Sequence, residues 1–178
     1  MINYQILADS QEFYEKAGYS VIETPWTVTR AISDITRPTY AKDFKLENRD
    51  KVLVASAEQV FLYLYNKGFL PKGKFQSISP CFRDEPFDTY HSKYFIKNEL
   101  INTIDVSEQS LEKMIEDARL FFQRYFPTKY PVVVKTPQGF DLEVDKIELG
   151  SYGIRETKFL KYVYGTGVAL PRLSRVIG

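Results

Sequence analysis

Two strand-like runs of alternating character, separated by a polar loop, stand out in the middle of the chain. The runs cover residues 74–82 and 94–104, and the polar loop between them contains Pro, Asp and Thr together with the only histidine, His91. Two such runs around a turn-rich interval predict a β-hairpin with a long loop. Charged residues on this hairpin need partners or a ligand if the strands are half buried, so the hairpin is the first candidate for a functional site. These charged residues are Arg83, Glu85, Lys97 and Glu99.

The most regular helical pattern follows the hairpin. Ser107 is a typical N-cap residue, apolar residues then recur every three or four positions, and Pro127 ends the pattern. One apolar stripe predicts a helix that covers one face of a sheet. The stripe comprises Leu111, Met114, Ile115, Ala118, Phe121, Phe122 and Tyr125.

Weaker patterns predict the remaining elements. Asp9 with Glu12 resembles a capping box for a first helix that ends at Gly18, and a second helix is expected over residues 58–66. Residues 27–50 predict only short, irregular structure, and a short helix is expected after Pro171. Further strands are expected at residues 21–26, 51–56, 132–134, 140–149 and 159–164.

Composition narrows the class of protein. The 178 residues suit one domain, over residues 1–178, and the order of elements predicts an α+β fold with a mainly antiparallel sheet flanked by helices. With 24 basic and 23 acidic residues the net charge is +1, so the protein as a whole has no electrostatic attraction for nucleic acid. The single cysteine, Cys81, excludes an internal disulfide and a cysteine-based zinc site. We find no signal peptide and no apolar run near the ~20 residues that span a membrane, and we expect a cytoplasmic protein without a membrane segment.

Three segments, taken in order, resemble the three motifs of class II aminoacyl-tRNA synthetases. Residues 18–25 resemble the first motif, a helix leading to a strand that ends in a proline at the dimer interface; here that proline is Pro25. The Arg-Asp-Glu run at residues 83–85, followed by Phe95, resembles the hairpin of the second motif. Residues 165–172 resemble the third, a glycine-rich strand leading to a helix with an arginine. The resemblance covers almost the whole chain and implies a class II catalytic domain that forms a homodimer.

Further segments resemble the seryl-type branch of this family. Ser56-Ala57-Glu58 stands where that branch has a Thr-x-Glu element facing the amino acid, and residues 95–100 resemble its Phe-x-Lys-x-Glu strand. Residues 148–151 match its Glu-x-x-Ser element, which supports a metal ion on the nucleotide phosphates. Pro171 departs from the pattern, because the family usually has an acidic residue before the third-motif arginine.

The resemblance implies an ATP site. A forked guanidinium suits the α-phosphate in the transition state of carboxylate activation, and Arg83 would take this role. Phe95 and Arg172 would enclose the adenine, and Glu85 would accept a hydrogen bond from its exocyclic amine. His91 would reach the γ-phosphate.

The same resemblance implies a metal ion and an amino-acid pocket. Glu148 offers a hard oxygen ligand for Mg²⁺, with Ser151 as a weaker neutral one. Glu58 would pair with the ammonium group of an amino acid. No catalytic base is needed, because the carboxylate substrate is itself the nucleophile. The amino-acid-binding residues would be Ser56, Glu58, Lys97 and Glu99.

Structural interpretations stay open beside these roles. Arg83 and Glu85 also fit a cross-strand ion pair, and Phe95 fits the core. Gly165 and Gly167 fit close backbone packing as well as a nucleotide wall.

Three other positions have equally plain interpretations. His91 fits a solvated surface, Glu148 and Ser151 fit the end of a strand at a turn, and Cys81 fits a small buried apolar residue.

We therefore carry three hypotheses of function. The first is ATP-dependent activation of an amino acid, or a similar carboxylate, as an acyl adenylate, with transfer to tRNA, a carrier protein or an amine. The second is a catalytically inactive synthetase paralogue that serves as a regulatory or assembly subunit. The third is a tRNA-binding part of a larger enzyme or complex.

Overall fold

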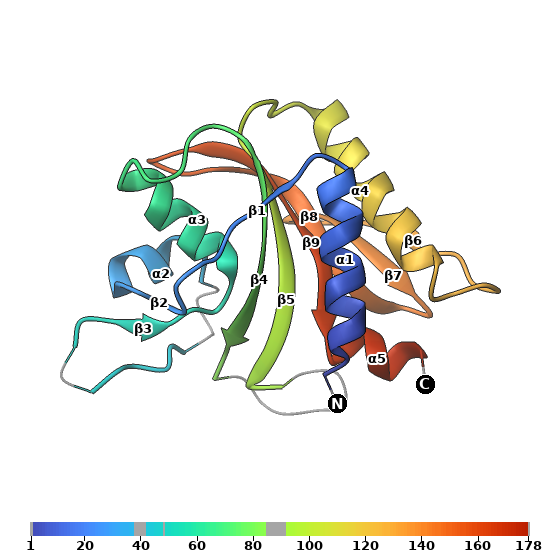
Figure 1. Cartoon of the computed structure of the whole chain (residues 1–178), viewed down its shortest axis with the longest axis horizontal. Coiled ribbons are helices and arrows are strands. Elements are labelled where there is room, and N and C mark those ends of the chain that lie inside the picture. Colours follow the sequence, from blue (N-terminus) through green and yellow to red (C-terminus); the bar gives the residue numbers. More distant parts are fainter. Residues whose placement is uncertain (1, 38–41, 48, 85–91, 178) are drawn as a thin grey trace.

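The computed structural model describes residues 2–37, 42–47, 49–84 and 92–177. Within these ranges seven strands form one sheet in the order β1-β4-β5-β9-β8-β7-β6, and two short strands form a second sheet (Figure 1). Neighbouring strands of the large sheet are antiparallel, except that β1 runs parallel to β4. The predicted α+β class with a mainly antiparallel sheet is thus confirmed.

The described residues contain five helices and nine strands. The helices are α1 (Tyr4–Lys16), α2 (Arg30–Thr36), α3 (Ala57–Asn66), α4 (Glu108–Gln123) and α5 (Arg172–Ile177). The strands are β1 (Ser20–Val21), β2 (Thr27–Val28), β3 (Val52–Leu53), β4 (Lys74–Phe82), β5 (Tyr94–Asn102), β6 (Val132–Thr136), β7 (Gly139–Val144), β8 (Ile147–Glu156) and β9 (Lys161–Leu170).

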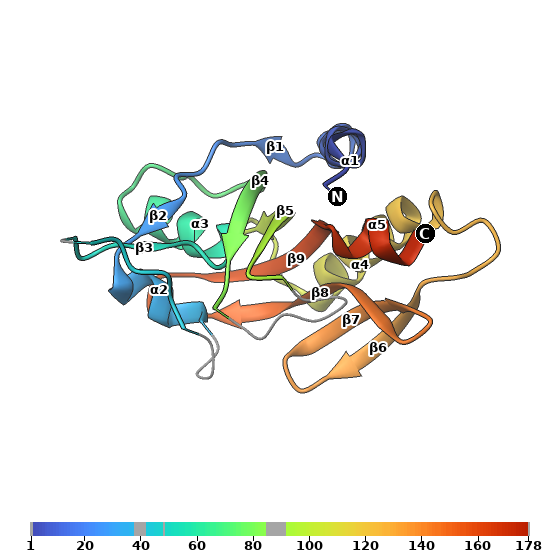
Figure 2. The same ribbon diagram turned by 90° about the horizontal axis from the view of Figure 1, so that it is seen from below.

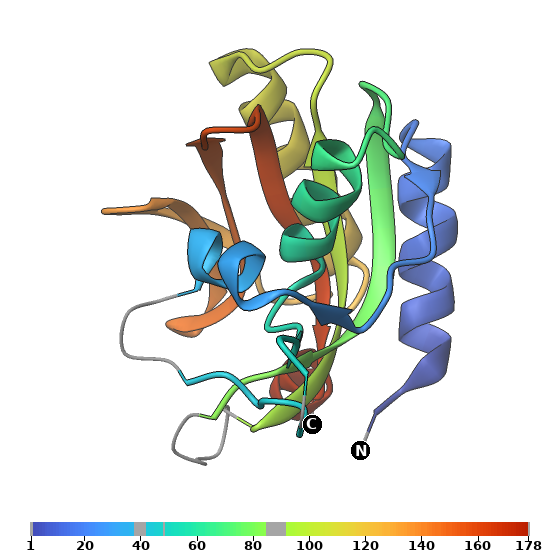
Figure 3. The ribbon, with the colours of Figure 1, turned by 90° about the vertical axis from the view of Figure 1, so that its left-hand side faces the viewer.

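Helices cover both faces of the large sheet. Figure 3 shows α1 and α3 on opposite sides of β4, with α2 beside α3. The larger core lies on the α1 and α4 side, where Tyr14 and Met114 pack against Tyr152 of β8 with full burial of all three side chains. The smaller core lies under α3, where Phe61 packs with Ile101 and Tyr162. The β6–β7 hairpin extends away from this body (Figure 2).

Two glycines let the helices approach β9 closely. A Cβ atom at Gly165 would lie 2.5 Å from Met114 Sδ of α4, and one at Gly167 would lie 2.8 Å from Tyr14 Cε2 of α1. Gly167 is also the extra residue of a bulge opposite Asn98 of β5, and its carbonyl oxygen accepts a 3.0 Å hydrogen bond from the Tyr14 hydroxyl. These glycines therefore serve close packing on the helix side of β9.

The sequence predicted the central hairpin and two helices closely. β4 and β5 pair antiparallel from Lys74 opposite Asn102 to Phe82 opposite Tyr94. The side chain of Ser107 caps α4 by accepting a hydrogen bond from the Ser110 amide. α3 covers the expected segment, with Ser56 as its N-cap.

The predicted start of the first helix is wrong. Asp9 lies in the second turn of α1, where it accepts a hydrogen bond from the Gln5 amide group. The N-cap is Asn3, whose side chain accepts hydrogen bonds from the amides of Gln5 and Ile6 and so satisfies two donors of the first turn. Gly18 follows the helix as predicted, with a φ of 91°.

Other boundaries differ from the prediction for local reasons. The interval 27–50 contains α2, and the expected strand over 51–56 is reduced to β3. The expected strand over 140–149 is interrupted by Asp145 and Lys146, which have φ values of 53° and 64° and turn β7 into β8. The expected strand over 159–164 begins at Lys161 and continues to Leu170, because the glycine segment stays within β9.

Cys81 is fully buried at the end of β4. Burial, together with the charge of Glu99, raises the pKa of its thiol to about 12. The thiol is therefore protonated at neutral pH, as expected for a small apolar residue.

None of the helices in the described ranges has the length and apolar character that a membrane crossing needs.

Candidate active site

A cavity of about 300 Å³ opens on the α3 side of the sheet. Its walls come from the ends of α2 and β4, the start of α3, and strands β5, β8 and β9. Nine of the predicted site residues line it, although they come from four separate parts of the sequence. They are Ser56, Glu58, Arg83, Phe95, Lys97, Glu99, Glu148, Ser151 and Arg172.

Of the remaining predicted residues, Pro25 alone belongs to the described part of the chain. Glu85 and His91 lie outside the described residues. Pro25 lies elsewhere on the surface, in the exposed segment that follows the edge strand β1.

Alternation along β5 explains how one strand supplies both the cavity and the core. Successive side chains of a strand point to opposite faces, so Phe95, Lys97 and Glu99 share one face. All three line the cavity. Ile96 and Leu100, on the other face, are buried in the larger core.

Glu99 is a buried carboxylate with both oxygens occupied. The Ser56 hydroxyl lies 2.7 Å from each oxygen, Lys97 Nζ lies 2.8 Å from Oε1, and the Glu58 amide donates to Oε2 at 3.3 Å. Burial alone would raise the pKa of Glu99, but Lys97, Ser56 and Arg83 outweigh it and hold the pKa below its ordinary value. Glu99 is therefore ionised and fully paired.

Glu58 lies beside it in a different environment. The Tyr162 hydroxyl donates to its Oε1 at 2.7 Å, and Arg155 Nη1 donates to the same oxygen at 2.5 Å. Burial, with the nearby charge of Glu99, raises the pKa of Glu58, although Arg155 and Tyr162 oppose this shift. The two glutamates at this end of the cavity thus have pKa values displaced in opposite directions.

The other end of the cavity is more open and holds two arginines. Arg83 donates from Nε to the Ala55 carbonyl at 3.3 Å, and its guanidinium lies 5.2 Å from the centre of the Phe95 ring. Arg172 forms a 2.9 Å ion pair with Glu148, and the Glu148 side chain is 44% exposed. Both guanidinium groups line the cavity and have few partners within the described ranges, so they suit an anionic ligand.

Glu148 and Ser151 belong to a small group of oxygen donors on β7 and β8. Asp141 of β7 lies directly opposite Ser151. Burial, with the charges of Glu148 and Glu143, raises the pKa of Asp141, and the Ser151 side chain opposes the shift. In the described part of the chain no three His, Cys, Asp or Glu side chains gather closely enough to form a metal site alone.

Sequence reasoning missed several cavity residues. Arg155 is 97 residues from Glu58 along the chain, and no local pattern marks it. Arg37 belongs to the end of α2, which was not predicted, and it pairs with Asp34 at 2.6 Å. Asp141, which lies opposite Ser151 beside the cavity wall, was missed too, and its alternation with apolar residues on β7 is the one signal that could have singled it out.

Comparison with known proteins agrees with this geometry. The family model described as tRNA synthetases class II (D, K and N) matches residues 1–129, more than half of the chain. No curated protein sequence matches the chain significantly.

Solved structures of low sequence identity share the fold. The seryl-tRNA synthetase of Pyrococcus horikoshii, solved with ATP, superposes with a TM-score of 0.80 at 17% identity, over 97% of this chain and 49% of that one. The cytoplasmic serine-tRNA ligase of Naegleria fowleri, solved with AMP, gives 0.73 at 21% identity, over 96% and 52%. The pyrrolysyl-tRNA synthetase of Desulfitobacterium hafniense gives 0.76 at 15% identity, over 97% and 68%.

This chain therefore spans about half the length of the two seryl enzymes. The family match, the shared fold and the cavity that gathers residues of the second and third motifs lead to one conclusion. The chain belongs to the class II tRNA synthetases, and it forms a class II catalytic core.

Proposed function

We propose that the chain binds ATP together with an amino acid or similar carboxylate and joins the two as an acyl adenylate. The observation that carries this proposal is the charge of the cavity. The side chains that line it in the described ranges include five cations and three carboxylates. The cations are Arg37, Arg83, Lys97, Arg155 and Arg172, and the carboxylates are Glu58, Glu99 and Glu148. Lys97 and Arg155 are tied to Glu99 and Glu58 at the buried end, so the positive charge that suits the phosphates of a nucleotide is that of Arg83 and Arg172.

The reaction forms one bond and breaks one. An oxygen of the substrate carboxylate attacks the α-phosphorus, and the bond from that phosphorus to the oxygen bridging to the β-phosphate breaks. Pyrophosphate leaves with the electron pair. Arg83 would stabilise the charge that develops on the α-phosphate oxygens, because a rigid strand end positions its guanidinium beside the cavity.

The adenine would lie on the Phe95 ring. Phe95 is half buried at the cavity wall, and a planar base stacks well on an aromatic face. In the structure the partner of this ring is Arg83, whereas Arg172 pairs with Glu148. We propose that Arg172 exchanges Glu148 for the nucleotide and closes over the adenine. Glu85 and His91 keep their predicted roles on the adenine amine and the γ-phosphate.

Mg²⁺ fits the oxygen donors on β7 and β8. Glu148 and Ser151, with the neighbouring Asp141, would hold the ion. Burial, with the charges of Glu148 and Glu143, raises the pKa of Asp141, and a cation beside these carboxylates would favour its ionised form. When bound, the ion would neutralise charge on the phosphates. Glu148 would then gain a metal partner as Arg172 turns toward the nucleotide.

The amino acid would lie at the buried end of the cavity. Glu58 would accept its ammonium group, while Ser56, Lys97 and Glu99 form one paired cluster that shapes the pocket. The acceptor of the acyl group stays open between tRNA, a carrier protein and an amine. A cytoplasmic location stays a prediction.

We also propose a homodimer through the β1 edge. Val21 and Trp26, which flank the segment leading to Pro25, are 42% and 60% exposed. An apolar edge beside a parallel edge strand suits pairing with a second copy. Sedimentation equilibrium of the chain and of Trp26→Arg would test this, since the substitution should shift the balance toward monomer.

Amino-acid-dependent exchange of labelled pyrophosphate into ATP tests the adenylation proposal. We expect exchange with at least one amino acid at a protein concentration that ensures dimers, and none without Mg²⁺. Binding of Mg-ATP, seen as a raised Tm, without exchange would favour the inactive paralogue instead. A chain that shows neither response contradicts the proposal.

A further inference from the structure

Glu58 is anchored through a single carboxylate oxygen. In the described part of the chain both hydrogen bonds to its carboxylate, from Arg155 Nη1 and from the Tyr162 hydroxyl, end on Oε1. A carboxylate has about four lone-pair sites over its two oxygens, so Oε2 keeps its full capacity as an acceptor. Glu58 also lines the cavity, which brings this capacity to the wall of the pocket.

Glu99 does not share this property. The Ser56 hydroxyl lies 2.7 Å from both of its oxygens, Lys97 occupies Oε1 and the Glu58 amide occupies Oε2. A donor from a ligand would have to displace one of these internal partners. Of the two buried glutamates, Glu58 is therefore the one with a carboxylate oxygen available to accept a hydrogen bond from a ligand.

The anchoring groups are held on rigid elements. Arg155 of β8 and Tyr162 of β9 are direct neighbours in the β8–β9 ladder. The Arg155 guanidinium also lies 4.4 Å from the centre of the Tyr164 ring. Side chains fixed by a ladder and by packing position a third group more accurately than loop residues do.

Charge at this position matters as well as geometry. Burial and the Glu99 carboxylate favour the protonated form of Glu58, and they raise its pKa. Arg155 and Tyr162 favour the ionised form, as does Lys97 of β5 from a greater distance. Only the ionised form offers acceptors alone, so an ammonium ligand requires it.

We propose that Arg155 and Tyr162 are positioning residues that hold Glu58 by Oε1 and leave Oε2 as the acceptor for the amino group of the substrate. The inference rests on the proposed adenylation. It deepens that function, because it selects carboxylates that carry a primary amine over simple carboxylic acids. Both residues would act through Glu58 and not on the reacting atoms.

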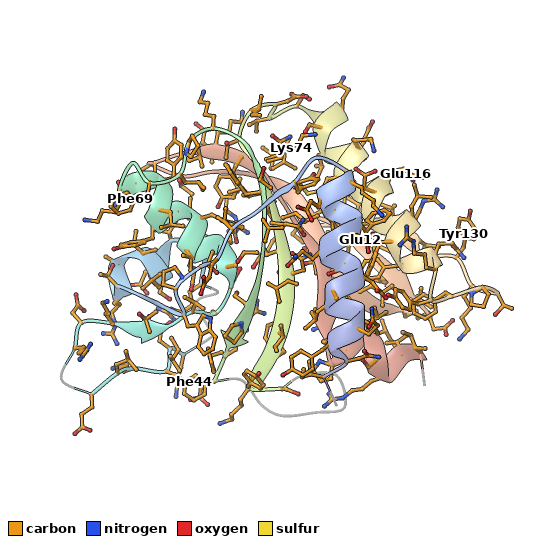
Figure 4. The ribbon with its side chains drawn as sticks, viewed as in Figure 1. Glu12, Phe44, Phe69, Lys74, Glu116 and Tyr130 are labelled. Carbon is orange, nitrogen blue, oxygen red and sulfur yellow. The ribbon has the colours of Figure 1, made fainter. Side chains whose placement is uncertain are left out.

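Three variants test the proposal in the pyrophosphate exchange assay. Arg155→Met removes the charge but keeps an elongated apolar stem, Arg155→Lys restores the charge, and Tyr162→Phe removes one hydroxyl. The matched control is Arg119→Met, which breaks the Arg119–Glu116 pair on α4. The Arg119 side chain is 22% exposed, close to the 26% of Arg155. Glu116 lies at the outer edge of the molecule, away from α3 (Figure 4).

We expect the variants to change KM for the amino acid and not KM for ATP. Arg155→Met should raise KM for the amino acid at neutral pH by about tenfold, which corresponds to roughly 1.4 kcal/mol, and leave KM for ATP within about twofold. The acid limb of kcat/KM for the amino acid should move to higher pH. Tyr162→Phe should show the same changes with smaller size, Arg155→Lys should recover part of the loss, and the control should change neither KM. An equal rise of both KM values in Arg155→Met, or an unmoved acid limb, would overturn the proposal.

A measurement without substrate separates this proposal from the adenylation on which it rests. The titration of Glu58 can be followed by NMR of carboxyl-labelled protein, with Glu58→Gln to assign the signal. In Arg155→Met its pKa should be higher than in the unaltered chain, and an unchanged pKa would refute the anchoring. If no amino acid supports exchange, the adenylation fails and the role of Oε2 fails with it, whereas a shifted Glu58 pKa would still support the anchoring.

Discussion

The two ends of the cavity differ in how their charged side chains are paired and in how far these are exposed. At the buried end, Glu99 and Lys97 are 3% and 14% exposed, and each carboxylate is tied to a cation at short distance. At the open end, Arg172 pairs with a Glu148 side chain that is 44% exposed, and among the described residues Arg83 contacts one backbone carbonyl and one ring. One end is arranged in advance of any ligand, and the other has cations that are available to an incoming anion.

This difference suggests a division of labour. A pocket whose polar groups are fixed by the fold discriminates between small ligands, because a wrong ligand leaves buried groups unpaired. An open cationic site binds flexible phosphates and can rearrange during the reaction. Substitutions at the open end should therefore affect catalysis, and substitutions at the buried end should also affect stability.

Arg83→Met should produce the largest effect. Loss of a preorganised positive group at the α-phosphate should lower kcat for exchange by about 10³-fold, which is roughly 4 kcal/mol, with little change in Tm. Arg83→Lys should recover only part of this, because an ammonium lacks the fork. Pyrophosphate exchange kinetics give kcat for each variant, and thermal melting gives Tm as a folding control. A full rate in Arg83→Met would remove Arg83 from the chemistry.

Glu99→Gln should be the most destabilising of the single charge changes in the cavity. It leaves Lys97 buried without its partner, and breaking such a pair costs about 3 kcal/mol. Urea denaturation measures the change in the free energy of unfolding. The matched substitution at the open end, Glu148→Gln, should change it by less than about 1 kcal/mol, since that pair is exposed. Equal losses at both ends would contradict the comparison.

The two buried glutamates should respond to pH with opposite signs. The folded state holds the Glu99 pKa below 4.5, so its contribution is present above that value and is lost as pH falls through the lower pKa. The pKa of Glu58 is raised above 4.5, so its contribution is greatest below 4.5 and is lost as pH rises through the higher pKa.

Urea denaturation between pH 3 and 7 tests this. From pH 7 to pH 3 the stability advantage of the unaltered chain over Glu99→Gln should shrink. Over the same range, the free energy of unfolding of the unaltered chain should rise relative to that of Glu58→Gln. Curves that run in the same direction would show that the two environments are alike.

Arg172→Met should have the smallest effect of the series. Its Glu148 partner is 44% exposed, so Tm should be almost unchanged. Loss of one cation from the nucleotide site should raise KM for ATP by about tenfold, or roughly 1.4 kcal/mol. Calorimetric titration with Mg-ATP would give the same change in Kd. Unchanged ATP binding would exclude Arg172 from the nucleotide site.

Local patterns in the sequence were enough for the hairpin and for the long helix α4, whereas the expectation of a shared site came from the resemblance to class II synthetases. Alternation on residues 94–102 predicts that Phe95, Lys97 and Glu99 share a face, and the structure places all three at the cavity. The stripe on α4 predicts its packing because a helix repeats every 3.6 residues. These features depend on neighbours within a few positions.

The missed features depend on distant or unusual partners. Arg155 meets Glu58 only because β8 lies beside β9 under α3, and a single sequence does not specify that arrangement. The turn at Asp145 and Lys146 lacks the glycine that usually marks two positive φ angles. α2 is seven residues long and too short for a clear apolar period.

The central claim is that the open end of the cavity receives ATP, and a structure of the chain with Mg-ATP tests it most directly. We predict the adenine on the Phe95 ring with Arg172 turned away from Glu148, and the α-phosphate within hydrogen-bonding distance of Arg83. The Glu58 and Glu99 pairs should be unchanged. ATP bound elsewhere, or an Arg172–Glu148 pair that stays intact beside the bound nucleotide, would contradict the account.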